Sequence, residues 1–378
     1  MLYYVLSSIS TVGRGEGAAG RIAVVSASIG AGHDGAAAEL ARRLRAAGFA
    51  VDRHDFLDLW PARLGRGLRA SYARQLRTAP KTWGWLLAVL ARYLPLTRLV
   101  AAVLALAAAR RTRAATAGPL AAVVSTYPLA SQALGRLRRR GELDVPVITF
   151  LTDMSVHPLW VARGVDAHLA LHEVAAAEAV RLGARAVQVA GPAVSPSFRP
   201  AAGEPERKAA RAALDLPATT PLALVVAGSW GVGEVAEAVA DIAACGVATP
   251  VVACGRNDEL RQRVAAAGTG IALGWTDRMP DLIRACDVVV QNAGGLSSLE
   301  ALASGVPVVT YRCLPGHGRT NAGALDRAGW ATWIRHPAQL PAALKQAMAD
   351  GRPVPSLDPT LDPAATVATI AQSWQATP

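Results

Sequence analysis

Short runs of β-branched residues alternate with alanine-rich stretches along most of this chain. Continuously apolar runs of this kind are typical of strands buried on both faces of a parallel sheet, and the alanine-rich stretches suit the helices that connect such strands. The pattern is interrupted once near the middle of the 378 residues and then starts again. We therefore predict an α/β protein with two Rossmann-like domains, each large enough to bury its own core.

The predicted strands form two sets of six. In the first half they are residues 21–26, 51–55, 121–125, 145–151, 167–171 and 186–189. In the second half they are residues 222–227, 250–254, 271–273, 288–291, 306–310 and 332–334. The segment between the two sets, residues 191–205, is rich in Pro, Gly and Ser and suits an interdomain linker. The expected units are a loose tail, two domains and a closing helix, at residues 1–20, 21–198, 199–360 and 361–378.

Composition excludes several classes of protein. Hydrophobic residues make up 52% of the chain and charged residues 18%, which argues against an intrinsically disordered protein. The four cysteines include no Cys-x-x-Cys pair, so we expect neither a disulfide framework nor a zinc site, and a reducing cytoplasm is the simpler setting. The best apolar stretch, residues 99–109, is 11 residues long, short of the ~20 that cross a bilayer.

Charge is distributed unevenly along the chain. The formal net charge is +11, and between Asp58 and Glu142 there are 15 Lys or Arg and no Asp or Glu, which indicates an anionic partner. Aromatic residues and leucines interleave with these charges, as in a surface that lies on a membrane, and the residues that we assign to it are Trp83, Trp85, Arg92 and Arg98. A buried helix is the alternative for the apolar positions. Nucleic acid is not expected, because the segment carries no recognisable binding motif.

A glycine-rich turn follows the first predicted strand. Its sequence, SASIGAGHDG, gives Gly30, Gly32 and Gly35 the spacing of a dinucleotide-binding loop, with Asp52 about 20 residues further on. Such glycines let backbone N–H groups approach a phosphate. A dinucleotide loop has no need for His33, whereas a reaction that requires a proton acceptor beside a phosphate would use it. We therefore take His33 as a catalytic or phosphate-contacting residue, with a role in packing or at the helix start as the alternative.

Polar residues also follow the predicted strand at residues 145–151. The sequence TDMSVHPLW puts Asp153, His157 and Trp160 at the carboxyl end of that strand, where open parallel sheets bind their ligands. Asp153 suits a residue that orients a base or holds an acceptor hydroxyl, although an aspartate that caps a loop is an equal alternative. His157 is a candidate catalytic residue, or it shapes the turn before the proline.

Two further glycine-rich turns lie in the second half. The first, VVAGSWGVGEV, offers close backbone approach to a diphosphate at Gly228, Ser229, Gly231 and Gly233. The second, QNAGGLSSLEALASGVPVV, combines a glycine pair and two hydroxyls with a carboxylate at the start of a helix, in Gly294, Gly295, Ser297, Ser298 and Glu300. A carboxylate there can accept both hydroxyls of a ribose, so the set indicates a nucleoside diphosphate. The alternative is that Glu300 only interacts favourably with the positive end of the helix dipole.

Taken together, these motifs resemble a known family. SIGAGHDGAA, TDMSVHPLW, CGRN, the block GWTDRMPDLIRACDVVVQNAGGLSSLEALASGVPVV and PGHGRTNA occur in this order over roughly residues 21–335. The pattern is similar to that of the monogalactosyldiacylglycerol synthases and bacterial processive diacylglycerol glycosyltransferases, which are related to the lipid-linked N-acetylglucosaminyltransferase of peptidoglycan synthesis. The resemblance implies a GT-B-type architecture, with two domains facing each other across a cleft. It also implies a UDP-sugar bound by the second domain and a lipid acceptor bound by the first.

The resemblance assigns roles to individual residues. His33 is implied as the base or as a phosphate contact, with Gly30 and Gly32 in the same loop, and the further donor-binding residues are Arg256, Arg319 and Asn321. No metal and no cofactor are required by such a reaction. Family members commonly carry Gln-Glu where this chain has His317 and Gly318, so the identity of the donor sugar does not follow from the resemblance.

The sequence thus predicts an inverting hexosyltransferase that moves a hexose from a UDP-sugar to a lipid such as diacylglycerol. We expect it to be cytoplasmic and peripheral on the inner face of the cell membrane, with His33 as the base and Asp153 as an alternative or orienting partner. One alternative is a glycosyltransferase that acts on a soluble natural product. Others are a dinucleotide-dependent oxidoreductase that uses Asp52 and a binding protein without catalysis. The acceptor, the processivity and the oligomeric state are not predicted.

Overall fold

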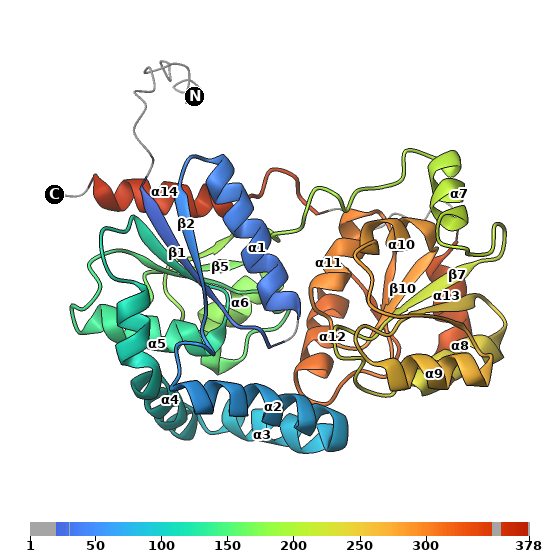
Figure 1. Ribbon diagram of the computed structural model, residues 1–378, viewed down its shortest axis with the longest axis horizontal. Helices are drawn as coiled ribbons and strands as arrows, with labels where there is room; N and C mark the ends of the chain where they lie inside the picture. Colours follow the sequence, from blue (N-terminus) through green and yellow to red (C-terminus); the bar gives the residue numbers. More distant parts are fainter. Residues whose placement is uncertain (1–19, 30, 350–356, 377–378) are drawn as a thin grey trace, which may run out of the picture.

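The computed structural model describes residues 20–29, 31–349 and 357–376 and contains two parallel six-stranded sheets in that part of the chain (Figure 1). The strand order is β2-β1-β3-β4-β5-β6 in the first sheet and β12-β11-β10-β7-β8-β9 in the second. Helices cover both faces of each sheet (Figure 1). The predicted α/β class with two Rossmann-like domains is therefore confirmed.

The first domain contains the amino-terminal half of the elements. Its strands are β1 (Arg21–Ser26), β2 (Ala50–Asp55), β3 (Ala122–Ser125), β4 (Val147–Phe150), β5 (Ala167–Ala170) and β6 (Val187–Val189). Its helices are α1 (Ala31–Ala46), α2 (Ala62–Thr78), α3 (Pro80–Arg92), α4 (Leu94–Ala115), α5 (Pro128–Arg139), the 3₁₀ turn η1 (Pro158–Trp160) and α6 (Glu173–Arg181).

The second domain repeats this alternation. Its strands are β7 (Leu222–Val226), β8 (Thr249–Ala253), β9 (Ile271–Leu273), β10 (Val288–Gln291), β11 (Val308–Thr310) and β12 (Thr332–Trp333). Its helices are α7 (Glu204–Ala212), α8 (Val235–Cys245), α9 (Asp258–Ala267), α10 (Met279–Ala285), α11 (Leu296–Ala303), α12 (His317–Arg327), the 3₁₀ turn η2 (Pro337–Gln339) and α13 (Leu340–Ala347). Every strand predicted from the sequence overlaps one of the observed strands.

Each sheet has one point at which the chain reverses the direction in which it adds strands. In the first sheet this point lies between β1 and β3, and in the second it lies between β7 and β10. Open parallel sheets bind their ligands outside the carboxyl ends of the strands at such a point. The topology therefore directs attention to the loops that follow these four strands.

The chain passes between the domains twice, first from β6 to α7 and again from α13 to α14 (Pro363–Gln375). The last helix returns to the first domain, where it packs against α1, and the Trp374 indole donates to the carbonyl of Asp144 at 3.1 Å (Figure 1). Arg43 of α1 binds both crossings, since it donates to the Val194 carbonyl at 2.6 Å and to the Asp362 carboxylate at 3.1 Å. The sequence did not predict where this helix docks.

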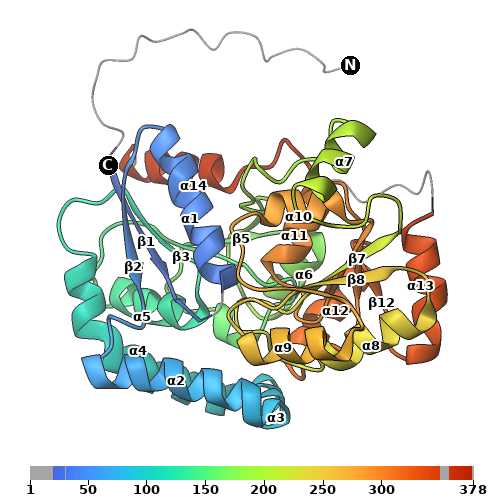
Figure 2. The same ribbon diagram turned by 45° about the vertical axis from the view of Figure 1, so that its right-hand side comes forward.

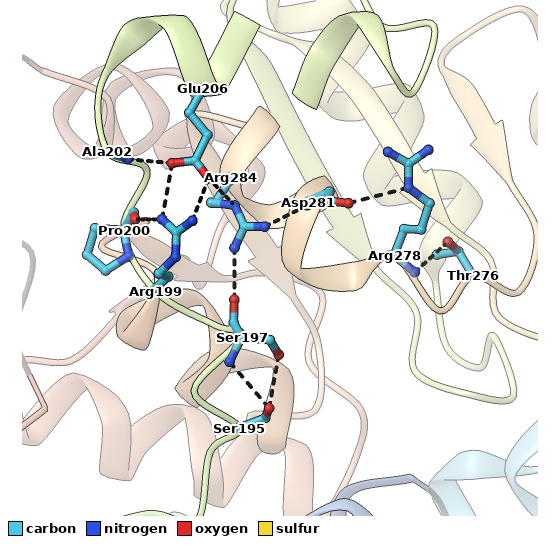
Figure 3. Close-up of polar contacts among 10 residues, drawn as sticks. All are labelled: Ser195, Ser197, Arg199, Pro200, Ala202, Glu206, Thr276, Arg278, Asp281 and Arg284. Carbon is cyan, nitrogen blue, oxygen red and sulfur yellow. Dashed lines mark hydrogen bonds and ion pairs between the residues drawn. The ribbon is translucent and has the colours of Figure 1, made fainter. Parts of the chain in front are cut away.

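A polar network holds the first crossing to the second domain (Figure 3). Arg199 donates to both carboxylate oxygens of Glu206, at 2.7 and 3.1 Å, and Arg284 donates to the carbonyl of Ser197 at 2.8 Å. Val194 is thus held by the first domain and Ser197 by the second, so the first crossing changes domains between these two residues.

Candidate active site

His33 lies in the first turn of α1, directly after the loop that follows β1. Its Nδ1 is 2.7 Å from the hydroxyl of Thr152, which follows β4. The Thr152 hydroxyl donates to the carbonyl of Thr126 at 3.4 Å, so we assign the proton between the two side chains to His33 Nδ1. This bond leaves the Nε2 lone pair of His33 as a proton acceptor, and no described residue hydrogen-bonds it.

Aromatic side chains and a carboxylate surround His33. Its ring meets Tyr127 edge-on at 5.6 Å between ring centroids and lies 6.0 Å from the ring of Trp160. The buried Trp160 indole donates to Asp153 Oδ2 at 2.9 Å. Asp153 and His33 therefore both contact the indole of Trp160. Sequence reasoning missed Tyr127 and Thr152, although Thr152 directly precedes Asp153 at the strand end.

His317 brings a third titratable side chain to this place from the second domain, as the first residue of α12. Burial lowers the pKa of His317, and the nearby His33 lowers it as well, whereas the Asp153 carboxylate raises it. These interactions place His317 close to His33 and Asp153 across the domain boundary. It stands at the position where the sequence departs from the family pattern.

His157 is engaged on both ring nitrogens. Its Nδ1 accepts from the backbone N–H of Leu159 at 3.2 Å, so Nε2 carries the proton and donates to the Leu87 carbonyl of α3 at 3.1 Å. Burial lowers the pKa of His157, while the Leu87 bond and the Asp153 charge oppose that effect. This arrangement fits a residue that fixes α3 to the first domain, and it leaves no ring nitrogen for the catalytic role that the sequence suggested.

The second domain presents backbone at its two glycine-rich turns, which follow β7 and β10 and flank the switch point. A Cβ added at Gly228 or Gly295 would meet nothing within 4 Å, so the chain there borders open space. At Gly231, Gly233 and Gly294 an added Cβ would lie 2.6–2.7 Å from a neighbouring atom. Gly228 and Gly295 thus leave space for a ligand, whereas Gly231, Gly233 and Gly294 allow the turns to pack closely against their neighbours.

Helix α11 begins directly after the second of these turns. Its N-cap residue, Gly295, supplies no side-chain cap, so backbone N–H groups and the positive end of the helix dipole remain available to an anion. Ser297 is half-buried in the first turn, whereas Ser298 is fully buried and its Oγ has no hydrogen-bond partner among the described residues.

Glu300 completes this half-site. Its side chain is half-buried, and burial raises the pKa of the carboxyl to about 7. No hydrogen bond from a described residue opposes that burial. A carboxylate that is partly removed from water without gaining donors is costly, and hydroxyl groups of a ligand would supply the missing hydrogen bonds.

The remaining predicted donor residues differ in their surroundings. The Arg256 guanidinium stacks on the half-exposed indole of Trp275, 4.3 Å from the ring centroid, and its backbone N–H donates to the carbonyl of Ser229 at 3.0 Å. Arg319 is exposed in the first turn of α12. Sequence reasoning missed Trp275, although the residue lies in the most specific block of the motif pattern.

Asn321 joins the two domains. Its side-chain Nδ2 donates to the carbonyl of Ala293, and its Oδ1 accepts from the backbone N–H and the hydroxyl of Ser155 at 3.0 and 2.8 Å. Arg327 of the same helix pairs with Glu178 of α6 at 2.6 Å. Both amide atoms of Asn321 are therefore used within the protein.

The same closure brings α1 against α11. A Cβ added at Gly35 would lie 2.5 Å from Leu296 Cδ2, and one at Gly32 would lie 3.9 Å from Leu296 N. The amino-terminal ends of the two helices, one from each domain, thus meet at the cleft. Gly30 lies outside the described residues.

Asp52, the acid of the dinucleotide alternative, sits within β2 and pairs with Arg21 at 3.1 Å. The carboxylate at the carboxyl end of β2 is instead that of Asp55, which binds the Ser28 hydroxyl and, at 2.8 Å, Arg69 of α2. In a dinucleotide-binding domain the acid that binds the ribose would lie at the end of β2, and that position is held by Asp55 and not by Asp52. Among the described residues there is also no group of three or more His, Cys, Asp or Glu side chains that could hold a metal ion.

Helices α2, α3 and α4 form a layer beside the first sheet (Figure 2). In α4 the small residues face the protein, and the buried positions are Thr97, Ala101, Ala105, Ala108 and Thr112. Val100 and Leu104 also pack inward, but Leu99, Val103 and Leu106 face outward and are 62%, 58% and 60% exposed. We call the outward residues, Leu96, Leu99, Val103 and Leu106 together with Trp85 and Tyr93, the apolar stripe.

The predicted membrane residues divide over this layer. Trp85 is 68% exposed, and Arg92 and Arg98 are exposed beside the apolar stripe. Trp83 instead packs against Val232 and Leu314 of the second domain. No single helix among the described residues is long and apolar enough to cross a membrane, and the pair formed by α3 and α4, which has the combined length, is bent by 108°.

The arrangement defines a class of protein. Two Rossmann-like domains pack against each other, the first carrying a histidine and a carboxylate beside its switch point and the second an uncapped helix end beside its own. This is the GT-B-type glycosyltransferase architecture that the motif pattern implied.

Comparison with known proteins agrees with this class. Residues 33–194 match the family model of monogalactosyldiacylglycerol synthase, and residues 224–350 match that of glycosyl transferases group 1. The chain is 26% identical over 238 residues to the processive diacylglycerol β-glucosyltransferase of Bacillus subtilis, and 28% identical over 236 residues to that of Bacillus cereus. Each match covers 60% of this chain and 60% of the relative. The resemblance predicted from the motifs is confirmed.

Solved structures share the fold over nearly the whole chain. Anabaena HepE in complex with UDP-glucose superposes with a TM-score of 0.52 at 15% identity, covering 94% of both chains. Acinetobacter baumannii MurG superposes with a TM-score of 0.50 at 14% identity, covering 95% of both chains.

Proposed function

We propose that this protein is an inverting glycosyltransferase that transfers a hexose from a UDP-sugar to the hydroxyl of a lipid acceptor at a membrane surface. One observation carries the proposal: one domain has a histidine whose Nε2 no described residue hydrogen-bonds, and the other has an uncapped helix end and a carboxyl without a donor among the described residues. The matches to a lipid glycosyltransferase family over residues 33–194 and to a general glycosyltransferase family over residues 224–350 support the same division of labour.

In the proposed reaction the acceptor oxygen attacks the anomeric carbon from the face opposite the diphosphate. The bond between that carbon and the acceptor oxygen forms while the bond to the diphosphate oxygen breaks. His33 Nε2 accepts the acceptor proton, and UDP leaves with the bonding electron pair. The N–H groups at the start of α11 stabilise the charge on the leaving diphosphate. Asp153, held by Trp160, orients the acceptor hydroxyl or the base.

The donor half of the proposal rests on complementary chemistry. The Glu300 carboxylate accepts hydrogen bonds from both ribose hydroxyls, which are partners that no described residue supplies. The open backbone at Gly228 and Gly295 receives the diphosphate. Trp275 and Arg256 suit the uracil ring, because Arg256 is hydrogen-bonded to the turn that contains Gly228. Arg319 lies two residues after His317 in α12 and suits a contact with the phosphate or the sugar.

The lipid half rests on the surface of the helix layer. Leu99, Val103 and Leu106 of α4 face solvent, close in sequence to Arg92 and Arg98, within a segment that lacks acids. Such a surface suits an anionic membrane, where arginines contribute electrostatic attraction and apolar groups insert. The relatives' names include diacylglycerol as acceptor, which supports a peripheral position on the inner face of the cell membrane.

The test is a donor and acceptor screen on the full chain. UDP release and product mass are measured with a panel of UDP-hexoses, with diacylglycerol in anionic vesicles or soluble alcohols as acceptor, and with His33→Ala as the control. We expect turnover only with a UDP-sugar, and highest with the vesicles. Turnover with soluble acceptors alone would favour the natural-product alternative, and no turnover with any UDP-sugar would contradict the proposal.

A further inference from the structure

Helix α3 touches the loops of the second domain that form the donor half-site. A Cβ added at Gly84 would lie 2.8 Å from Gly316 N and 2.9 Å from both the carbonyl carbon and Cβ of Pro315. Backbone atoms cannot give way as the end of a flexible side chain can, so only glycine at position 84 permits this approach. The neighbouring Trp83 packs against Val232 and Leu314.

The residues that α3 touches belong to one connected set of loops. Asn292 donates from Nδ2 to the carbonyl of Val232 at 2.9 Å, and its own carbonyl accepts from Leu314 N at 2.8 Å. Gly233 fits beside Asn292 and Leu314, where a Cβ would lie within 2.8 Å of each side chain. The turns after β7, β10 and β11 are therefore packed together, and α3 rests on this set.

The same helix is tied to the first domain and to the exposed surface. His157 Nε2 donates to the carbonyl of Leu87, and the hydroxyl of Thr97 in α4 donates to the carbonyl of Leu90. Trp85 is two residues from Trp83 on the helix and so points to the opposite side, where it is 68% exposed. One face of α3 thus contacts the donor loops, and the other belongs to the apolar stripe.

We infer that Trp83 and Gly84 are positioning residues for the donor loops, and that α3 couples docking of the apolar stripe on a membrane to binding of the nucleotide diphosphate. The inference rests on the proposed function and adds a regulation of the same site. A membrane that holds α3 in its docked position favours the loop arrangement that binds the diphosphate. By reciprocity, the diphosphate favours docking.

Two glycines in this layer provide a matched pair of variants. Gly67 lies in the exposed part of α2, and a Cβ added there would meet nothing within 4 Å. Gly67→Ala and Gly84→Ala make the same chemical change within a helix, with a similar gain in helix propensity. Only the second drives a methyl group into the loop before α12.

UDP affinity is measured by calorimetry for the wild-type full chain and both variants, with and without vesicles of phosphatidylglycerol and phosphatidylcholine. We expect the vesicles to tighten UDP binding by the wild type and by Gly67→Ala about fivefold, the lower end of typical coupling. Gly84→Ala should bind UDP about five- to tenfold more weakly and lose the vesicle effect. Donor KM should rise with little change in kcat, which separates positioning from chemistry.

Equal UDP binding and equal vesicle effects in Gly84→Ala and Gly67→Ala would overturn the inference while leaving the proposed function intact. A wild type that binds no UDP would contradict the proposed function itself. Should Gly84→Ala melt at a much lower temperature, Trp83→Phe and Trp83→Ala decide the matter. The inference requires the phenylalanine variant to keep UDP affinity and the alanine variant to lose it, and two equal affinities would contradict it.

Discussion

The two sides of the cleft hold their ligands by different means. The second domain offers open glycine turns, an uncapped helix end and one carboxyl to which no described residue donates. The first domain offers side chains that are already hydrogen-bonded to each other, with His33 on Thr152 and Asp153 on Trp160. The second domain thus offers an open binding surface, whereas the first domain holds a preorganised set of reacting groups.

This difference indicates that the second domain contributes mainly to nucleotide binding and the first domain mainly to the chemical step. Backbone N–H groups and a helix dipole recognise a diphosphate in whatever nucleotide carries it, and the carboxyl adds recognition of the ribose. An oriented imidazole contributes little to that binding, but it accelerates proton transfer. Variants on the two sides of the cleft should therefore change different kinetic constants.

The largest expected effect belongs to His33. His33→Ala should lower kcat by ~10²–10⁴, the usual contribution of a positioned acid–base group, with UDP affinity nearly unchanged. Steady-state kinetics and UDP calorimetry on the same preparation measure both quantities. Thr152→Val, which removes the partner that fixes the tautomer, should lower kcat less. Wild-type turnover in His33→Ala would move the role to Asp153, and loss of UDP binding would assign His33 to the phosphates.

A second expected effect concerns the apolar stripe of the helix layer. Replacing Leu99, Val103 and Leu106 together by serine should lower partitioning onto anionic vesicles by roughly 10²- to 10⁴-fold, because each large apolar side chain contributes about 1–2 kcal/mol on insertion. Melting temperature should hardly change, since these side chains face solvent. Sedimentation with vesicles measures the first quantity and calorimetry the second.

Neutralising Arg92 and Arg98 provides the matched electrostatic control. Each arginine near an anionic surface contributes about 1 kcal/mol, so Arg92→Gln with Arg98→Gln should weaken docking at low salt and much less at high salt. Equal sedimentation of the serine triple variant and the wild type would contradict docking through the stripe. Equal binding to neutral and anionic vesicles would contradict the electrostatic part.

A smaller effect comes from the raised pKa of Glu300. Because its folded-state pKa of about 7 lies above the ordinary 4.5, the native protein binds more protons than the unfolded chain between these pH values. The free energy of unfolding should therefore fall as the pH rises through that window, and Glu300→Gln should remove the fall. Denaturant titrations at several pH values measure it. An unchanged pH dependence in the variant would contradict the assigned pKa.

The fold was predictable from the sequence because most strands, such as β1, β7 and β10, are short β-branched runs buried in the sheet and separated by alanine-rich helices. The partner of His33 was not predictable, because Thr152 lies 119 positions away and only the order of β1, β3 and β4 in the folded sheet brings the two together. The docking of α14 was equally hidden, since its alanine-rich pattern specifies a buried face but no partner. The different environments of Trp83, which is packed, and Trp85, which is exposed, could have been predicted, because residues two apart on a helix point to opposite sides.

The central claim is that the second domain binds UDP through Glu300 and the start of α11. The most direct measurement is calorimetric titration of UDP and of NAD into the wild-type chain, His33→Ala and Glu300→Gln at pH 8. We predict that the wild type and His33→Ala bind UDP equally, that Glu300→Gln binds it about ten- to a hundredfold more weakly after loss of charge-assisted hydrogen bonds, and that NAD binds weakly to all three. Tight NAD binding without UDP binding, or UDP binding that is indifferent to Glu300→Gln, would contradict the account.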